Sequence, residues 1–308
     1  MSLLEIESLS VTLNKLSIVS DLSLRLERGQ TLALVGESGS GKSVSSLAIL
    51  GLINAEVTAK TLRFNGLDLL TLKPKARRAL LGKDMALIAQ DPMNALNPSL
   101  SIGYQLQEVL ATHLKLKGQA ATHKALELLD KVKIPNAKSR LSAYAHELSG
   151  GMNQRIAIAM ALACSPKLLI ADEPTTALDV TVQQQVLSLL TELQRDEKMA
   201  MLLVTHDLAL ASQYADDVCV MYAGQWVEQG LATELLTHPK HPYTEALLNA
   251  LPGAPDTPLK SLPGQVPNLG QRASGCLLAE RCAYRQACCQ QEPPVINNVR
   301  CFFPRSVP

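Results

Sequence analysis

Residues Gly36–Ser43 read G-E-S-G-S-G-K-S, and this octapeptide indicates both a fold class and a ligand. The apolar segment Thr31–Val35 before it predicts a strand, and Val44–Leu50 after it can begin a helix. In the pattern G-x-x-x-x-G-K-[ST], glycines let successive backbone N–H groups turn toward phosphate oxygens at a helix N-terminus. A glycine-rich turn that contained Lys-Ser by chance would need neither the strand nor the helix. We therefore expect a nucleoside triphosphate site. Its expected phosphate-binding residues are Gly36, Ser38, Gly39, Ser40, Gly41, Lys42 and Ser43, with Lys42 directed at the β- and γ-phosphates and Ser43 at Mg²⁺.

The composition is that of a soluble globular protein of about two domains. Of its 308 residues, 47% are hydrophobic and 19% charged, and 29 Lys and Arg balance 28 Asp and Glu. This balance, together with 3% aromatic residues, argues against a nucleic-acid partner. The first residues do not resemble a signal peptide, and the most apolar stretch, 156–164, is shorter than the roughly 20 residues that span a bilayer. We therefore expect a cytosolic protein that reaches a membrane only through partners.

The remaining pattern predicts an α/β protein with an inserted helical region. Alternating apolar residues at 8–13 and 22–26 predict antiparallel strands, and 61–64 followed by Asn-Gly predicts a hairpin. Apolar runs at 167–171 and 200–204 are typical of parallel strands buried on both faces, with a helix expected over 182–193. The predicted organisation is a nucleotide-binding core at 1–90 and 152–235, a helical subdomain at 91–151 and a C-terminal extension at 236–308.

Two acids follow the first of these buried strands. Asp172 is a candidate for holding Mg²⁺ through water, and Glu173 for polarising the attacking water as a general base. Many buried strands end in exposed acids, so the pair alone is a weak signal. Its position after a phosphate loop in the same α/β core favours the catalytic interpretation.

Ser149, Gly150 and Gly151 precede a predicted helix over 156–163. They form either a second anion-binding helix N-terminus or an ordinary serine N-cap with a flexible entry. A chain with one phosphate loop needs no second phosphate site of its own, whereas two chains packed head to tail would use both.

With these residues the sequence resembles the ATP-binding cassette (ABC) ATPases over about residues 1–235. L-S-G-G-M-N-Q-R at 148–155 is similar to the signature motif of that family. The other motifs follow in the family's order, namely the Q-loop Gln90, the Walker B pair Asp172-Glu173, the D-loop Ala177-Leu178-Asp179 and the switch His206. The resemblance implies a RecA-like parallel sheet with an antiparallel β subdomain.

The resemblance also implies how these residues act. One ATP is sandwiched between the phosphate loop of one subunit and Ser149, Gly150 and Gly151 of its partner, with Asp179 at the same interface. His206 contacts the γ-phosphate, and Gln90 senses Mg²⁺ and relays to a membrane partner. The implied catalytic residues are Glu173, His206 and Gln90, and the implied Mg²⁺ ligands are Ser43, Gln90 and Asp172.

A narrower resemblance is to the ATPases of dipeptide and oligopeptide importers. Q-D-P-M-N-A-L-N-P at 90–98 is similar to a run in these proteins, and so are H-P-Y-T at 241–244 and L-P-G at 262–264, so the likeness covers essentially the whole chain. Residues 43–49 match the D-type subunit more closely than the F-type. Two positions depart from the pattern: Ala89 replaces the usual Phe, and the aromatic residue that stacks on adenine is missing, which leaves Leu13 or Ile18 to pack there.

The implied function is that of a cytoplasmic ATPase subunit on the inner membrane. It would hydrolyse ATP to drive uptake of dipeptides or short oligopeptides through two permease subunits, with a paralogous ATPase as partner and a substrate-binding protein delivering the cargo. Similar ATPases serve nickel, glutathione and antimicrobial-peptide importers, so the cargo stays open.

Five of the seven cysteines lie between 276 and 301. Cys276, Cys282, Cys289 and Cys301 are separated by five, six and eleven residues, and Cys288 is a spare neighbour. The alternatives are disulfides, zinc, unligated thiols and an iron–sulfur cluster. A cytosolic location disfavours disulfides, and the close cysteine pairs of structural zinc sites are absent. Four thiolates on separated loops suit a cluster, and the importer ATPases carry a similar cysteine quartet. We therefore expect a [4Fe-4S] cluster that stabilises the tail by cross-linking it. We expect ATP binding to be independent of it, because the phosphate loop belongs to a separate core.

Two other classes fit less well. ABC ATPases that act on DNA or ribosomes carry long coiled-coil inserts or two cassettes in one chain, and this sequence has neither. A GTPase would carry N-K-x-D, whereas the Asn14-Lys15-Leu16-Ser17 segment ends in serine.

Overall fold

The structure is a computed structural model that describes residues 2–91, 95–176, 178–250, 262–268, 272 and 274–305. The chain forms two compact units. The first consists of Met1–Glu27, Thr31–Thr71 and Leu203–Pro308, and the second of Arg28–Gln30 and Leu72–Leu202. Parts of two predicted motifs, residues 92–94 and Ala177, lie outside the described residues.

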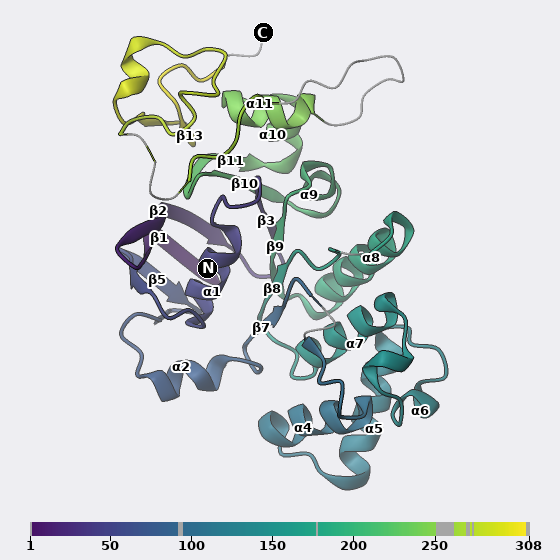
Figure 1. Cartoon of the computed structure of the whole chain (residues 1–308). Helices are drawn as coiled ribbons and strands as arrows, with labels where there is room; N and C mark the ends of the chain where they lie inside the picture. The colour runs from purple at the N-terminus through teal and green to yellow at the C-terminus, as the bar shows by residue number, and fades with distance from the viewer. Residues whose placement is uncertain are drawn as a thin grey trace. The chain divides into compact units, whose positions relative to one another are not determined.

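An antiparallel sheet occupies the N-terminal part of the first unit (Figure 1). It contains β1 (Leu4–Leu13), β2 (Leu16–Leu26), β4 (Glu56–Thr58), β5 (Thr61–Phe64) and β6 (Leu67–Asp68). β1 pairs with β2, β4 and β5, and its alternating apolar side chains are buried. Asn65 and Gly66 both have positive φ and close the β5–β6 hairpin, as the Asn-Gly pair predicts.

A second sheet of the first unit leads into the phosphate loop. Its order is β12 (Val295–Ile296), β13 (Val299–Arg300), β11 (Gln225–Leu231), β10 (Asp217–Tyr222), β3 (Thr31–Val35) and the end of β9 (Ala200–Thr205). β3 and β10 are parallel, with Val35 opposite Val220, and all of β3 is buried. The C-terminal extension thus adds two strands to this sheet, which the sequence patterns did not indicate.

Three helices pack with this sheet around one hydrophobic core. They are α9 (Leu208–Tyr214), α10 (Ala232–Thr237) and α11 (Pro242–Asn249). Tyr222 and Tyr243 are its largest members, with ring centroids 4.7 Å apart. Leu278 of the extension is buried in the same core, and Leu277 and Cys282 pack against it. The extension therefore shares the core of the first unit.

The second unit has its own parallel strands. β7 (Met85–Ile88) pairs in parallel with β8 (Leu168–Asp172), and the first half of β9 continues this sheet. Its helices are α2 (Pro74–Leu80), α4 (Ile102–Leu114), α5 (Gly118–Lys131), α6 (Ala137–Arg140), α7 (Gly150–Leu162) and α8 (Val180–Glu197), with a 3-10 turn at Ala145–Glu147. The strands expected from the apolar runs at 167 and 200 and the helix expected over 182–193 are confirmed, whereas β7 was not predicted.

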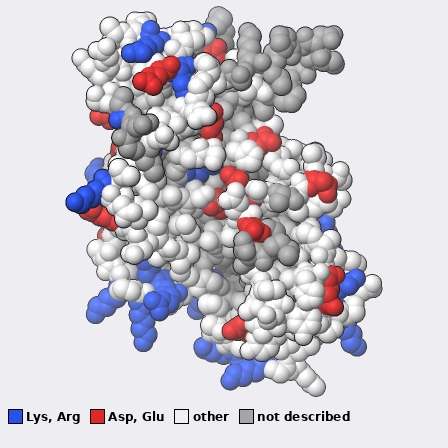
Figure 2. Space-filling model, viewed as in Figure 1, with Lys and Arg blue, Asp and Glu red and all other residues white. Residues whose placement is uncertain are grey.

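Charged side chains of both signs are spread over the face shown in Figure 2. Lys and Arg gather at α2, which carries Lys75, Arg77 and Arg78. The near-zero net charge of the sequence thus results from side chains of both signs that lie on the same face, with a local excess of basic side chains on α2. Within the described ranges, no helix is long and apolar enough to cross a membrane.

A buried histidine joins the sheet of the first unit to α11. His241 is the N-cap of α11: its Nδ1 accepts the N–H of Tyr243 at 3.1 Å, and its own backbone N–H donates to Glu228 of β11 at 2.9 Å. The side chain is 2% exposed, and burial lowers the pKa of His241 to about 3. The fold therefore holds this imidazole in its neutral form.

The pKa of His241 predicts a loss of stability in mild acid. A group whose folded pKa is depressed below about 6.5 contributes its full stability above that pH and loses it as the pH falls toward the folded pKa. We expect the free energy of unfolding, measured with urea, to fall by about 1.4 kcal/mol on this account between pH 7.5 and pH 5.5. His241→Asn keeps an N-cap acceptor but cannot titrate, so it should remove that part of the loss. The exposed His238→Asn is the matched control, and an unchanged pH dependence in His241→Asn would refute the assignment.

Candidate nucleotide-binding site

The predicted phosphate loop follows β3 and enters α1 (Lys42–Leu50) in the first unit. Gly36 is buried, Ser38 and Gly39 are exposed, and Gly41 is the N-cap of α1 with a φ of 97°. Ser40 N–H donates to the Glu37 carbonyl at 3.2 Å, so the loop makes a turn before the helix begins. The strand, loop and helix expected from the octapeptide are confirmed.

Lys42 is held against the backbone of this loop. Its Nζ donates to the carbonyl oxygens of Gly36 at 2.7 Å and Glu37 at 3.0 Å, and the residue is 4% exposed. Its charge therefore lies at the N-terminus of α1, where the helix dipole also favours anions. Ser43, the second residue of α1, is half-buried beside it in the sequence. This combination suits a polyphosphate.

The loop lies very close to β10. A Cβ on Gly36 would come within 2.1 Å of the Met221 carbonyl oxygen. The Gly224 N–H, in the turn after β10, donates to the Ser40 carbonyl at 2.9 Å. The first glycine of the motif is therefore required by packing against the neighbouring strand.

The second unit brings Gln90 and Glu173 together. Asp172 is the buried last residue of β8, and Glu173 follows it with a left-handed φ of 45°, uncommon for a residue with a side chain. The Glu173 Oε2 accepts hydrogen bonds from Gln90 Nε2 at 3.1 Å and from Thr176 Oγ1 at 3.0 Å. Two donors on one oxygen fix the direction of the carboxylate. Thr176 was not among the residues that the sequence motifs predicted.

The signature segment begins α7 in the second unit. Ser149 is exposed, and its hydroxyl accepts the Met152 N–H at 3.3 Å, as an ordinary N-cap does. A Cβ on Gly151 would come within 2.8 Å of Val182 of α8. Asp179 is exposed and caps α8 by accepting the Val182 N–H at 2.9 Å. Both capping residues thus belong to helix starts with exposed surface.

The remaining predicted residue is His206, which is exposed directly after β9 in the first unit. The next residue, Asp207, caps α9 by accepting the N–H groups of Ala209 and Leu210. The phosphate loop and His206 therefore belong to the first unit. Gln90, Asp172, Glu173, Asp179 and the signature residues belong to the second.

The four predicted cluster cysteines are not arranged as a metal site. Among the residues that the structure describes, no three His, Cys, Asp or Glu side chains are placed to hold a metal ion. Burial and then the neighbouring sulfurs raise the pKa of Cys276 to about 11, and burial raises the pKa of Cys282 and Cys301. Protonated thiols have no charge to draw them together, and thiolates without a cation repel one another. The expected [4Fe-4S] site is thus not supported by the side-chain positions.

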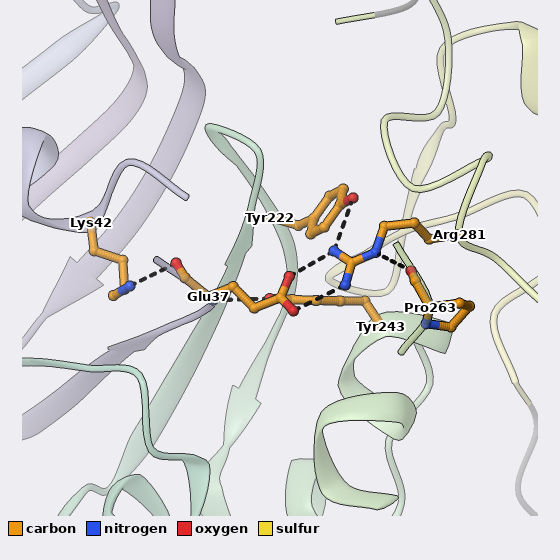
Figure 3. A network of polar contacts seen from close by, with 6 residues as sticks. All are labelled: Glu37, Lys42, Tyr222, Tyr243, Pro263 and Arg281. Carbon is orange, nitrogen blue, oxygen red and sulfur yellow. Dashed lines mark hydrogen bonds and ion pairs between the residues drawn. The ribbon is translucent and has the colours of Figure 1, made fainter. Parts of the chain in front are cut away.

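The extension nevertheless contacts the phosphate loop. Arg281, next to Cys282, forms an ion pair with Glu37 of the octapeptide (Figure 3). The reason given for ATP binding being independent of a cluster, that the phosphate loop belongs to a separate core, was therefore wrong; the independence itself stays a prediction. No sequence motif connects these two residues, which are 244 positions apart.

Comparison with known proteins identifies the family. Residues 19–176 match the family model described as ABC transporter, and residues 227–289 match the one described as oligopeptide/dipeptide transporter, C-terminal region. The Dipeptide transport ATP-binding protein DppD of Haemophilus influenzae is 50% identical over 97% of this chain and 93% of its own. The protein of the same name from Escherichia coli is 49% identical over 99% of this chain and 97% of its own. This chain belongs to the ABC transporter family.

A solved ABC structure agrees with this assignment. cbiO1 of Clostridium perfringens, described as part of the ABC transporter complex cbiONQ, superposes with a TM-score of 0.66 at 26% identity. The match covers 77% of this chain and 91% of cbiO1. The chain is accordingly an ATP hydrolase with the α/β fold of the ABC cassettes.

The packing of Gly36 against β10 predicts that a single methyl group disrupts the loop. We expect Gly36→Ala to lower the free energy of unfolding by about 1–3 kcal/mol, because the Met221 carbonyl must shift. The affinity for ATP should fall at least about tenfold, the equivalent of about 1.4 kcal/mol. Gly230→Ala in β11 is the control, since a Cβ there meets no atom within 4 Å. Urea unfolding and ATP titration measure both effects, and equal behaviour of the two variants would contradict this account.

Proposed function

We propose that this chain is the ATP-hydrolysing subunit of an importer for dipeptides or short oligopeptides. The observation that carries the proposal is the 50% identity to a dipeptide transport ATP-binding protein over nearly the whole chain, including the C-terminal region named for such transporters. The ordered phosphate loop with Lys42 inside it supports the ATP-binding part of the proposal.

The proposed roles of the individual residues follow the resemblance to the ABC ATPases. Gly36, Ser38, Gly39, Ser40, Gly41 and Lys42 bind the phosphates, and Ser43, Gln90 and Asp172 ligate Mg²⁺ directly or through water. Glu173 acts as the general base on the attacking water, and its two hydrogen bonds hold it in a single orientation. His206 contacts the γ-phosphate.

The proposed active assembly contains a second ATPase chain. Ser149, Gly150, Gly151 and Asp179 would contact the ATP held by that partner, and the exposure of Ser149, Gly150 and Asp179 supports this. A helix whose serine already accepts one N–H still presents further N–H groups to an anion. The partner is a paralogous ATPase, and two permease subunits hold the pair at the cytoplasmic face of the inner membrane. A substrate-binding protein delivers the peptide to the permeases.

Replacing Glu173 tests the hydrolytic role. Glu173→Gln should bind ATP like the unmodified protein but hydrolyse it about 10²–10⁴-fold more slowly, the range for losing a general base. Glu192→Gln is the matched control, since Glu192 is exposed on α8 and pairs with Lys133. Phosphate release measures turnover, and near-normal turnover in Glu173→Gln would remove Glu173 from this role.

The same two variants test the importer assignment in cells. A host that lacks this gene and requires an amino acid should fail to grow on a dipeptide that contains it. Growth should return with the unmodified gene and with Glu192→Gln, but not with Glu173→Gln. Undiminished dipeptide uptake in the deletion strain would favour another cargo.

We further propose that Cys276, Cys282, Cys289 and Cys301 ligate a [4Fe-4S] cluster once it is supplied. Backbone N–H groups donate to each sulfur: Leu278 to Cys276, Tyr284 to Cys282, Gln286 to Cys289 and Phe303 to Cys301. Such donors stabilise anionic sulfur ligands. The chemistry of the donors therefore suits a cluster, although the side chains must move to bind one.

Iron analysis of anaerobically purified protein tests this proposal. We expect a brown protein with broad absorption near ~400 nm and about four irons per chain. Replacing any one of the four cysteines by Ser should abolish the colour, whereas Cys288→Ser should retain it. Stoichiometric zinc without iron, or colourless metal-free protein, would overturn the proposal.

A further inference from the structure

The C-terminal extension binds the phosphate loop through one side chain, that of Arg281. Arg281 Nη1 donates to Glu37 Oε2 at 2.7 Å, and Nη2 donates to Glu37 Oε1 at 3.1 Å (Figure 3). Its Nε donates to the Pro263 carbonyl at 2.8 Å, and its Nη1 also reaches the Tyr222 hydroxyl at 3.4 Å. The guanidinium thus joins two parts of the extension to the loop and to the end of β10.

The two partners of this ion pair have unequal access to solvent. The side chain of Arg281 is 7% exposed, whereas that of Glu37 is 31% exposed. The guanidinium also lies over the Tyr222 ring, with its central carbon 5.6 Å from the ring centroid. A buried cation in this position depends on Glu37 for neutralisation, because leaving one member of a buried pair alone is unfavourable. The geometry is bidentate, the form that arginine makes and lysine does not.

Glu37 is held in three directions at once. Its N–H donates to the hydroxyl of Tyr243 at 3.0 Å, and its carbonyl accepts from Lys42 Nζ at 3.0 Å. Tyr243 lies on α11 and is fully buried. The carboxylate bound to Arg281 is the third anchor. The position of Glu37 therefore depends on the extension, on α11 and on the lysine of the loop together.

The charge of Glu37 makes its neutralisation relevant to ATP. This carboxylate follows Gly36, whose carbonyl binds Lys42, so it lies within one residue of the atoms expected to surround the phosphates. An unpaired carboxylate there would repel a triphosphate. Arg281 offsets that charge and draws the side chain toward the extension (Figure 3).

A second arginine of the extension makes an independent contact in the first unit. Arg272 donates to the carbonyls of Ser17 at 2.8 Å and Ile18 at 3.2 Å on β2. Ile18 is one of the two residues expected to pack where adenine binds. The extension is thus in contact with the loop and with a strand beside the expected base site.

We propose that Arg281 is a positioning residue for ATP binding: by pairing with Glu37 it fixes the phosphate loop, and it transmits occupancy of that loop to the C-terminal extension. The proposal rests on the proposed ATP site. Because coupling between two sites is reciprocal, a change in the extension should alter the affinity for ATP, and ATP should alter the extension.

A double-mutant cycle in the full-length protein tests the positioning role. Arg281→Gln should raise the Kd for Mg²⁺–ATP about tenfold, because it frees the loop and leaves the Glu37 carboxylate unpaired. Glu37→Gln frees the loop without that repulsion and should raise the Kd about threefold, and the double variant should be no weaker than Arg281→Gln. Arg281→Lys should lie between the unmodified protein and Arg281→Gln, since it keeps the charge but not the bidentate geometry. At saturating ATP the turnover number should stay within about threefold of that of the unmodified protein. The substitutions should therefore raise KM and leave kcat nearly unchanged.

Arg305→Gln is the matched control from the same tail. Arg305 is 40% exposed, pairs with Glu245 at 3.5 Å and lies over the Tyr284 ring, so its loss should leave the Kd unchanged. Unchanged ATP affinity in both Arg281→Gln and Glu37→Gln would overturn the proposal. If Arg281→Gln does not fold, Glu37→Gln alone decides, because the amide oxygen of the new side chain can still accept a hydrogen bond from Arg281. An unmodified protein that binds no ATP would instead refute the proposed function.

Hydrogen exchange tests the transmission to the extension. In the unmodified protein, Mg²⁺–ATP should slow exchange of amides near 278–281, where Arg281 N–H donates to the Leu278 carbonyl at 2.8 Å. In Glu37→Gln, saturating Mg²⁺–ATP should leave these amides unchanged. Equal slowing in both proteins would show that Glu37 does not carry the coupling, which also overturns the proposal.

Discussion

The closeness of the phosphate loop to β10 is the constraint on which the rest of the first unit depends. Gly36 fits against the Met221 carbonyl only because it has no Cβ, and this contact directs the chain into the turn before α1. Lys42 can then reach back to the Gly36 carbonyl. Parallel pairing of β3 with β10 keeps the two backbones in register up to this point. A binding site for phosphates thus results from strand packing as much as from glycine flexibility.

The helix starts of the second unit combine a stabilising cap with the role that we propose for them in the assembly. Ser149 satisfies the Met152 N–H within its own chain, and Asp179 does the same for Val182. These are ordinary caps, each worth about 1 kcal/mol to its helix. An N-cap satisfies only part of the unpaired N–H groups of a helix start. The structural and the functional interpretations of the signature segment are therefore compatible.

The sequence predicted structural features that are set by residues close together in the chain. The strand at 31–35 and the turn at Asn65-Gly66 follow from local periodicity and backbone preference. β11 was missed because the acid Glu228 interrupts its apolar pattern, and the N–H groups of Lys240 and His241, which lie outside the strand in the sequence, donate to the buried carboxylate. The contact between Arg281 and Glu37 was missed for the same reason: its partners are 244 residues apart. Cysteine spacing indicated a possible ligand set but contained no information about distances between sulfurs.

The separation of Glu37 from Arg281 also has a consequence for biosynthesis. The ribosome makes the phosphate loop near the start of translation but releases Tyr243 and Arg281, which anchor it, only after more than two hundred further residues. At the usual ~5–20 residues per second this delay is about 12–50 s. During this time the nascent chain has the lysine and glycines for ATP, but the side chains that fix Glu37 do not yet exist. The phosphate loop is therefore the first nucleotide-binding motif to be synthesised, but it is among the last to gain all the contacts that hold it in place.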